Sequence, residues 1–120
     1  MKQSPIFTRT YDFLLWLLPR TTKFPREQRF VLAKAVQETA LCFYEALIEA
    51  ALGEDQARTL ARADLDLTKL RFYLRLCRDL GLITPRQHHH VAEMVAEIGR
   101  LMGGWRKSVS GEALRARTAP

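Results

Sequence analysis

The helical pattern between residues 60 and 78 constrains the fold of this chain more than any other feature. At about 100° per residue, one side of a helix here collects six apolar residues: Leu60, Ala63, Leu67, Leu70, Leu74 and Cys77. A second apolar stripe lies on nearly the opposite side and consists of Leu65, Phe72 and Leu76. A helix in a small lone domain usually needs one apolar face. The segment therefore predicts a helix that packs in a core and also meets a second protein surface.

A row of arginines occupies the flank of the same helix, at positions i, i+4 and i+7: Arg71, Arg75 and Arg78. Arginine suits phosphate because its planar fork donates two hydrogen bonds at once. The formal net charge of +6 favours a polyanionic partner, with nucleic acid before an acidic membrane surface. We expect Asp64 to pair with Arg71 or Arg75, or to make a hydrogen bond within a bundle. The alternative is that the row is a solvated face laced with salt bridges to nearby aspartates.

The N-terminal half of the chain predicts two further helices. The first runs from about Thr8 to Leu18, because Pro19 interrupts the helical hydrogen bonds. Its inner face is expected to carry Tyr11, Leu14, Leu15 and Leu18. The second helix starts with Pro25 in its first turn and continues to about Leu52, with Gly53 as its terminator.

The C-terminal half adds two helices with clear boundaries. The helix with the arginine row spans about Asp55 to Leu80 and ends at Gly81. The last helix begins at Thr84–Gln87, which has a capping-box pattern with proline at the first helical position, and ends near Lys107. Residues 109–120 have no sustained apolar face and predict a flexible basic tail. Three more basic residues near the end of the last helix extend the candidate binding surface: Arg100, Arg106 and Lys107.

Long helices joined by short links predict antiparallel neighbours. We therefore expect an all-α fold, an up-down antiparallel four-helix bundle over residues 1–108, with a short flexible C-terminal tail over residues 109–120. A chain of 120 residues fits one such domain. Its apolar runs are too short to span a bilayer, so the sequence predicts no signal peptide, no transmembrane segment and a cytoplasmic protein.

The sequence offers little support for catalysis or a cofactor. His88, His89 and His90 are consecutive and point about 100° apart on a helix, so they cannot face one ion, and we expect them to be solvated or to face an anion. Cys42 and Cys77 have no metal-ligand spacing. No phosphate loop or nucleophile elbow is present. The expected protein is non-enzymatic and holds no metal or cofactor, and a metal-dependent bundle enzyme is the weakest alternative.

Two segments together resemble a known family. Residues Leu70 to Leu76, followed by Ala96 to Trp105, are similar to motifs of the accessory variability determinant proteins of diversity-generating retroelements. These small four-helix-bundle proteins are similar in turn to bundle proteins encoded in ribosomal RNA intervening sequences. The resemblance covers about Phe7 to Lys107.

The resemblance implies a homopentamer with a basic surface that binds the retroelement's reverse transcriptase and associates with template RNA and RNA–DNA products. Such a subunit supports mutagenic copying of a template repeat. By motif match, Arg71 and Arg75 are the best candidates for partner or RNA contact, with Arg78 as an extension. Leu65, Phe72 and Leu76 are the candidate oligomer interface. The alternative is an oligomeric scaffold of the intervening-sequence type with an acidic protein partner.

Overall fold

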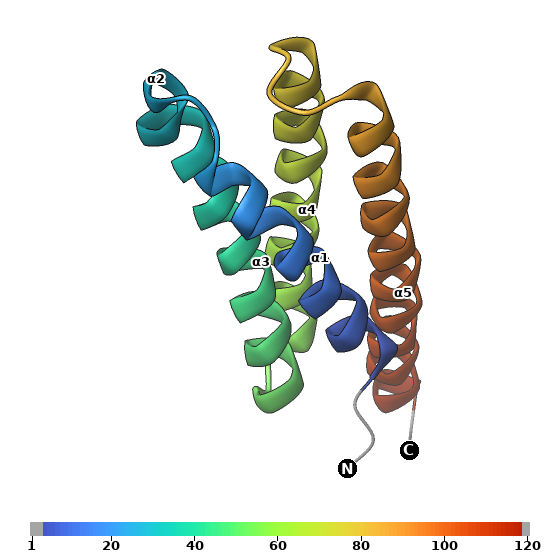
Figure 1. The fold of residues 1–120 in the computed structure, drawn as a ribbon. Helices are drawn as coiled ribbons and strands as arrows, with labels where there is room; N and C mark the ends of the chain where they lie inside the picture. Colours follow the sequence, from blue (N-terminus) through green and yellow to red (C-terminus); the bar gives the residue numbers. More distant parts are fainter. Residues whose placement is uncertain (1–3, 119–120) are drawn as a thin grey trace.

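The computed structural model describes residues 4–118, which form four long helical segments and no strand (Figure 1). Helix α1 spans Pro5–Thr22. The short α2 (Arg26–Gln28), the π-helical η1 (Arg29–Ala33) and α3 (Lys34–Leu52) follow one another without a break. Helix α4 spans Gln56–Asp79 and α5 spans Pro85–Thr118. The all-α four-helix prediction is confirmed.

The helices close a ring around one core. Helix α3 packs against α4, α4 against α5, and α1 against both α5 and α3. Helix α1 runs obliquely across the bundle, from α5 near the N-terminus towards the start of α3 (Figure 1). Within the described part of the chain, no helix is long and apolar enough to cross a membrane.

The inner face of α4 was predicted correctly. All six residues of its first apolar arc are buried: Leu60, Ala63, Leu67, Leu70, Leu74 and Cys77. Facing them, α5 buries Val91, Val95, Ile98 and Met102. Burying one leucine-sized side chain contributes about 1.5–3 kcal/mol, so these two faces together hold α4 and α5 in register.

Local signals set the ends of α4 and α5 as expected. Gly81 has a φ of 74°, and the backbone N–H groups of Gly81 and Leu82 donate to the carbonyls of Arg78 and Cys77. This pattern is a Schellman motif, which terminates α4. At the start of α5 the Thr84 hydroxyl accepts a hydrogen bond from the Gln87 N–H, and the Gln87 side chain accepts one from the Thr84 N–H. The predicted capping box is therefore present.

Helix α1 continues past Pro19, so its predicted end at Leu18 is wrong. Proline removes one backbone hydrogen bond, but side chains supply donors to the carbonyls around it. The Thr21 hydroxyl donates to the carbonyls of Leu17 and Leu18, and the Thr22 hydroxyl donates to that of Leu18. The last turn of α1 is thereby held in helical form up to Thr22.

The predicted inner face of α1 was also partly wrong. Tyr11 and Leu15 were assigned to it but are exposed, whereas Phe13 and Leu17 are buried. Leu14 is buried as expected. Apolar residues surround this helix, so periodicity alone does not select one face, and packing against α3 and α5 makes the choice.

Two further features depart from the sequence prediction. The π-helical turn η1 interrupts the expected regular helix, and Phe30 and Val31 within it are exposed. Helix α5 continues to Thr118, well beyond its predicted end near Lys107. Most of the segment predicted to be a tail is thus helical. Its flexibility stays a prediction, and residues 119–120 lie outside the described part of the chain.

Candidate functional site

The arginine row of α4 lies beside α5 and flanks a shallow cavity between the two helices, the α4/α5 cavity. The cavity has a volume of about 250 Å³ and is lined by Arg71, Leu74, Arg75, His88, Ala92 and Val95. Leu74 and Val95 are buried, whereas the side chains of Arg71 and Arg75 are exposed. The structure therefore combines an apolar base, to which both helices contribute, with a cationic edge from α4.

Three of the six basic residues in the predicted binding surface are paired with carboxylates of the chain itself. The pairs are Arg78 with Asp79 at 2.9 Å, Arg106 with Asp64 at 3.0 Å, and Arg100 with Glu97. Asp64 thus does not form the ion pair with Arg71 or Arg75 that its spacing on α4 suggested. Packing of α5 against α4 brings Arg106 to it instead, across 42 positions of sequence.

The other three basic residues are available to a ligand. Arg71, Arg75 and Lys107 are exposed and make no hydrogen bond or ion pair with a described residue. Arg71 and Arg75 line the α4/α5 cavity, whereas Arg100, Arg106 and Lys107 do not. The predicted surface therefore separates into a pair of unpaired arginines at the cavity, Arg78 near the end of α4, and three basic residues along α5.

Gly99 makes room for the side chain of Arg71. A Cβ atom at position 99 would lie 2.6 Å from Arg71 Nη2, well inside normal contact distance. The same atom would be 3.7 Å from Leu67 Cδ2, which is an ordinary contact. Gly103, one turn further along α5, faces open space. Gly99 therefore allows the Arg71 guanidinium to lie close against α5.

His88 is the partly buried histidine of the three and lines the cavity. Burial lowers the pKa of His88, and the positive charges of Arg78 and Arg75 lower it further, while Asp79 opposes them. The neutral form is thus favoured in this cationic setting. Sequence reasoning expected the histidines to be solvated or to face an anion but did not single out His88.

The other two histidines face away from this cavity. His89 Nε2 lies 2.9 Å from Glu93 Oε1, and both side chains are largely exposed. The His90 ring lies 5.9 Å from the Trp16 ring, centroid to centroid, at the contact between α1 and α5. The three consecutive histidines therefore occupy three different environments, as their angular spacing on a helix requires.

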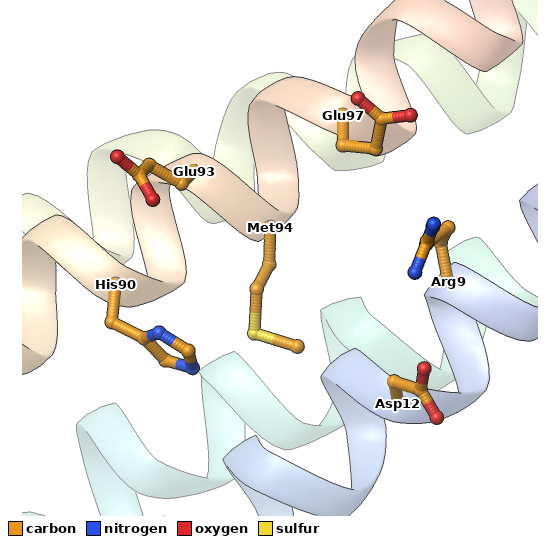
Figure 2. Close-up of a pocket in the computed structure, with 6 residues that line it drawn as sticks. All are labelled: Arg9, Asp12, His90, Glu93, Met94 and Glu97. Atoms are coloured by element: carbon orange, nitrogen blue, oxygen red, sulfur yellow. The ribbon is translucent and has the colours of Figure 1, made fainter.

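A second hollow, of about 220 Å³, separates α1 from α5 (Figure 2). Its lining residues are Arg9, Asp12, His90, Glu93, Met94 and Glu97. The Met94 side chain points from α5 towards α1, while the charged groups stand around it (Figure 2). Within residues 4–118, no group of three His, Cys, Asp or Glu side chains is placed to hold a metal ion. The mixed charges of this hollow give no preference for an anion.

The second apolar stripe of α4 is exposed, as the sequence predicted. The exposed fractions are 55% for Leu65, 68% for Phe72 and 45% for Leu76. Three apolar side chains in such positions are typical of a protein contact surface. Whether subunits meet there stays a prediction.

Trp105, which ends the second motif of the sequence resemblance, has a structural role. Its ring packs against Phe7 of α1, with the centroids 6.2 Å apart. This contact joins the N-terminal part of α1 to α5, so this part of the motif supports the bundle rather than the cavity.

Comparison with known proteins agrees with the fold. The bAvd-like family model matches residues 5–109. Among solved structures, one similar chain is a Bacteroides thetaiotaomicron protein of unknown function from the S23 ribosomal protein family, determined at 1.70 Å resolution. The two chains are 19% identical and superpose with a TM-score of 0.78 over 85% of this chain and 95% of that one. No curated protein matches the sequence.

Proposed function

The chain belongs to the bAvd-like family, and on that premise we propose that it is a non-enzymatic accessory subunit of a diversity-generating retroelement. In this proposal the basic α4/α5 face binds RNA and RNA–DNA products, and the subunit also binds the retroelement's reverse transcriptase. The observation that carries the proposal is the pair of unpaired arginines, Arg71 and Arg75, at the α4/α5 cavity.

Unpaired arginines support this role better than a high total charge does. An arginine already paired with a carboxylate must break or share that pair before it binds phosphate, which offsets part of the gain. Arg78, Arg100 and Arg106 are in that position. Arg71 and Arg75 have no such competitor, so they should contribute most to phosphate binding.

Binding through these arginines should depend strongly on salt. Each phosphate contact releases bound counterions, so each lost contact lowers the slope of log affinity against log salt by about 0.7–0.9. A charged hydrogen bond contributes roughly 1.5–3 kcal/mol, which corresponds to at least about tenfold in affinity per arginine. Such contacts position the RNA backbone without reading its bases.

The direct test is an RNA-binding series in increasing salt. Arg71→Ala/Arg75→Ala should weaken binding by about 100-fold and reduce the slope by about 1.5. Arg58→Ala/Lys69→Ala is a control with the same charge change on the same helix, because both side chains are exposed, make no hydrogen bond or ion pair with a described residue and do not line the α4/α5 cavity. An equal loss of RNA affinity in both variants would show that net charge alone causes the effect. A wild-type protein that does not bind RNA would refute the nucleic-acid role.

The reverse-transcriptase role needs its own measurement. We expect the chain to co-purify with the reverse transcriptase of its own retroelement, and we expect this complex to survive nuclease treatment. Loss of the complex after nuclease treatment would show that RNA alone bridges the two proteins and would refute direct binding.

The exposed stripe on α4 supports a second part of the proposal, that subunits associate into a homopentamer. Five chains of net charge +6 would create a strong positive field, which attracts RNA and is screened by salt. The number five comes from the family resemblance, and Leu65, Phe72 and Leu76 are proposed as the contact because they are exposed together on one face.

Light scattering tests this assignment. Leu65→Glu/Phe72→Glu should preserve helicity and yield smaller particles, because two buried carboxylates would oppose association. Leu15 and Leu41 are exposed apolar residues on α1 and α3, so Leu15→Glu/Leu41→Glu is the matched comparison. A reduced particle mass in that variant alone would show that the subunits meet at the α1/α3 side and not at the α4 stripe.

A further inference from the structure

We propose that the α4/α5 cavity is a phosphate-binding subsite in which Arg75 and His88 together hold one phosphate group, with Arg71 at the other end of the cavity. The proposal rests on the nucleic-acid role proposed above and adds His88 as a ligand-binding residue. The phosphate could come from the backbone of a nucleic acid or from a free phosphate ion, and both present the same oxygen acceptors.

The size and lining of the cavity fit this ligand. Its volume of about 250 Å³ exceeds the space that a few waters occupy, each taking about 30 Å³, so a phosphate and part of its ester fit. Arg75 comes from α4 and His88 from α5, so the packing of these two helices brings both side chains to the cavity. The positive charge of Arg75 acts on the His88 imidazole there. The buried Leu74 and Val95 at the base exclude water from one side of the group.

The side chains around His88 carry more positive than negative charge. Arg75 and Arg78 face it from α4, and Asp79 is the acidic group that opposes them, while His89 is its neighbour on α5. Asp79 is already paired with Arg78, with 2.9 Å between Nη2 and Oδ1. Positive charge near His88 is therefore balanced incompletely by the chain itself, and an oxyanion in the cavity would complete the balance.

Close approach of a backbone to α5 is also possible at this position. Ala92 lines the cavity, and Gly99 lies about two turns further along α5, where it admits the Arg71 guanidinium. The small side chain of Ala92 leaves the surface of α5 low beside the cavity, whereas the space above Gly99 is filled by the Arg71 guanidinium. A phosphodiester chain could thus follow the helix while one of its phosphates occupies the cavity.

Binding should be linked to protonation of His88. An anion beside the imidazole favours the charged ring, so it raises the pKa of His88 towards or above its usual value. By linkage, the complex takes up a proton, and affinity increases as the pH falls through the range in which His88 titrates. A phosphodiester carries one negative charge throughout this range, so His88 rather than the ligand would cause the change.

The test is a histidine titration of the full chain by NMR, with inorganic phosphate compared with chloride at equal ionic strength. Phosphate should raise the pKa of His88 by about one unit and leave those of His89 and His90 nearly unchanged. Arg75→Ala should abolish the rise, and Arg100→Ala should preserve it because Arg100 does not line the cavity. Equal shifts at all three histidines, or no shift of His88 with either inorganic phosphate or an oligonucleotide, would overturn the subsite.

A second arm uses a short oligouridylate without terminal phosphates. A shift of His88 with this ligand alone identifies a backbone diester as the occupant, and a shift with inorganic phosphate alone identifies a free phosphate. His88→Gln should keep RNA binding but remove its increase at lower pH. If RNA binds through Arg71 and Arg75 without moving His88, the subsite is wrong and the proposed function stands. If phosphate moves His88 but RNA does not bind, the subsite stands and the proposed function falls.

Discussion

Substitution of Gly99 by alanine tests how the structure holds Arg71 in place. Alanine in a helix interior is more favourable than glycine by about 0.5–1 kcal/mol, because the unfolded chain loses less freedom. At Gly103, where the new Cβ meets nothing within 4 Å, the full gain should appear. For a domain of this size, 1 kcal/mol corresponds to a rise in Tm of about 4 °C.

Gly99→Ala should also stabilise the fold but weaken ligand binding. The new Cβ would lie 2.6 Å from Arg71 Nη2, so the guanidinium must move by about 0.8 Å to reach the 3.4 Å of ordinary contact. Arg71 makes no hydrogen bond with a described residue, so its movement breaks no bond in the free protein. A displaced guanidinium bonds phosphate with poorer geometry, which should cost about 1 kcal/mol, or about fivefold in affinity.

Thermal denaturation and RNA binding of the two variants give the answer. We expect both Gly99→Ala and Gly103→Ala to melt above the wild type and only Gly99→Ala to bind more weakly. In an Arg71→Ala background, Gly99→Ala should have no further effect on affinity, because its target is gone. Equal affinity in the two alanine variants would refute the reasoning. Marked destabilisation by Gly99→Ala would show that this glycine serves helix packing instead.

Three further predictions concern the core and its titrating groups. Thr10→Val should raise the free energy of unfolding by up to about 1 kcal/mol, because the buried Thr10 hydroxyl has no partner among the described residues. Thr21→Val should lower it by about 1–2 kcal/mol, because it removes the proton that the hydroxyl shares between the Leu17 and Leu18 carbonyls and the bond that the hydroxyl accepts from Gln37. Equal changes of the two variants in urea denaturation would contradict this. A maleimide should label exposed Cys42 in the native protein and not Cys77, whose pKa burial raises to about 11; mass spectrometry showing both labelled would refute it. The free energy of unfolding should fall as the pH drops below about 6.5. The fold lowers the pKa of His88, so the unfolded chain binds the proton more readily than the folded chain does. The Tm of His88→Gln should therefore vary less with pH than that of the wild type.

Much of the fold follows from signals that act within one or two helical turns. The capping box at Thr84 and the glycine at Gly81 set the boundary between α4 and α5 as predicted. Where apolar residues repeat on one clear arc, as from Leu60 to Cys77, the buried face was also predicted correctly. Around α1 no such arc exists, and the exposure of Tyr11 and Leu15 could not be read from periodicity.

The candidate site divides in the same way. The sequence by itself determined that Arg71 and Arg75 share a flank of one helix and that Leu65 and Phe72 lie elsewhere on it, because helical geometry assigns those directions. Only the tertiary structure decided which arginines stay unpaired, since Asp64 meets Arg106 across the α4/α5 contact.

The same holds for His88 and Gly99. Each acquires its surroundings from a neighbouring helix: His88 from Arg75 and Arg78, and Gly99 from Arg71. Helical spacing relates residues on one helix, whereas the rotation of α5 against α4 is set by how their buried faces pack. The sequence by itself therefore determined four helices and an arginine row. The tertiary structure decided that two of those arginines and a histidine meet around one cavity.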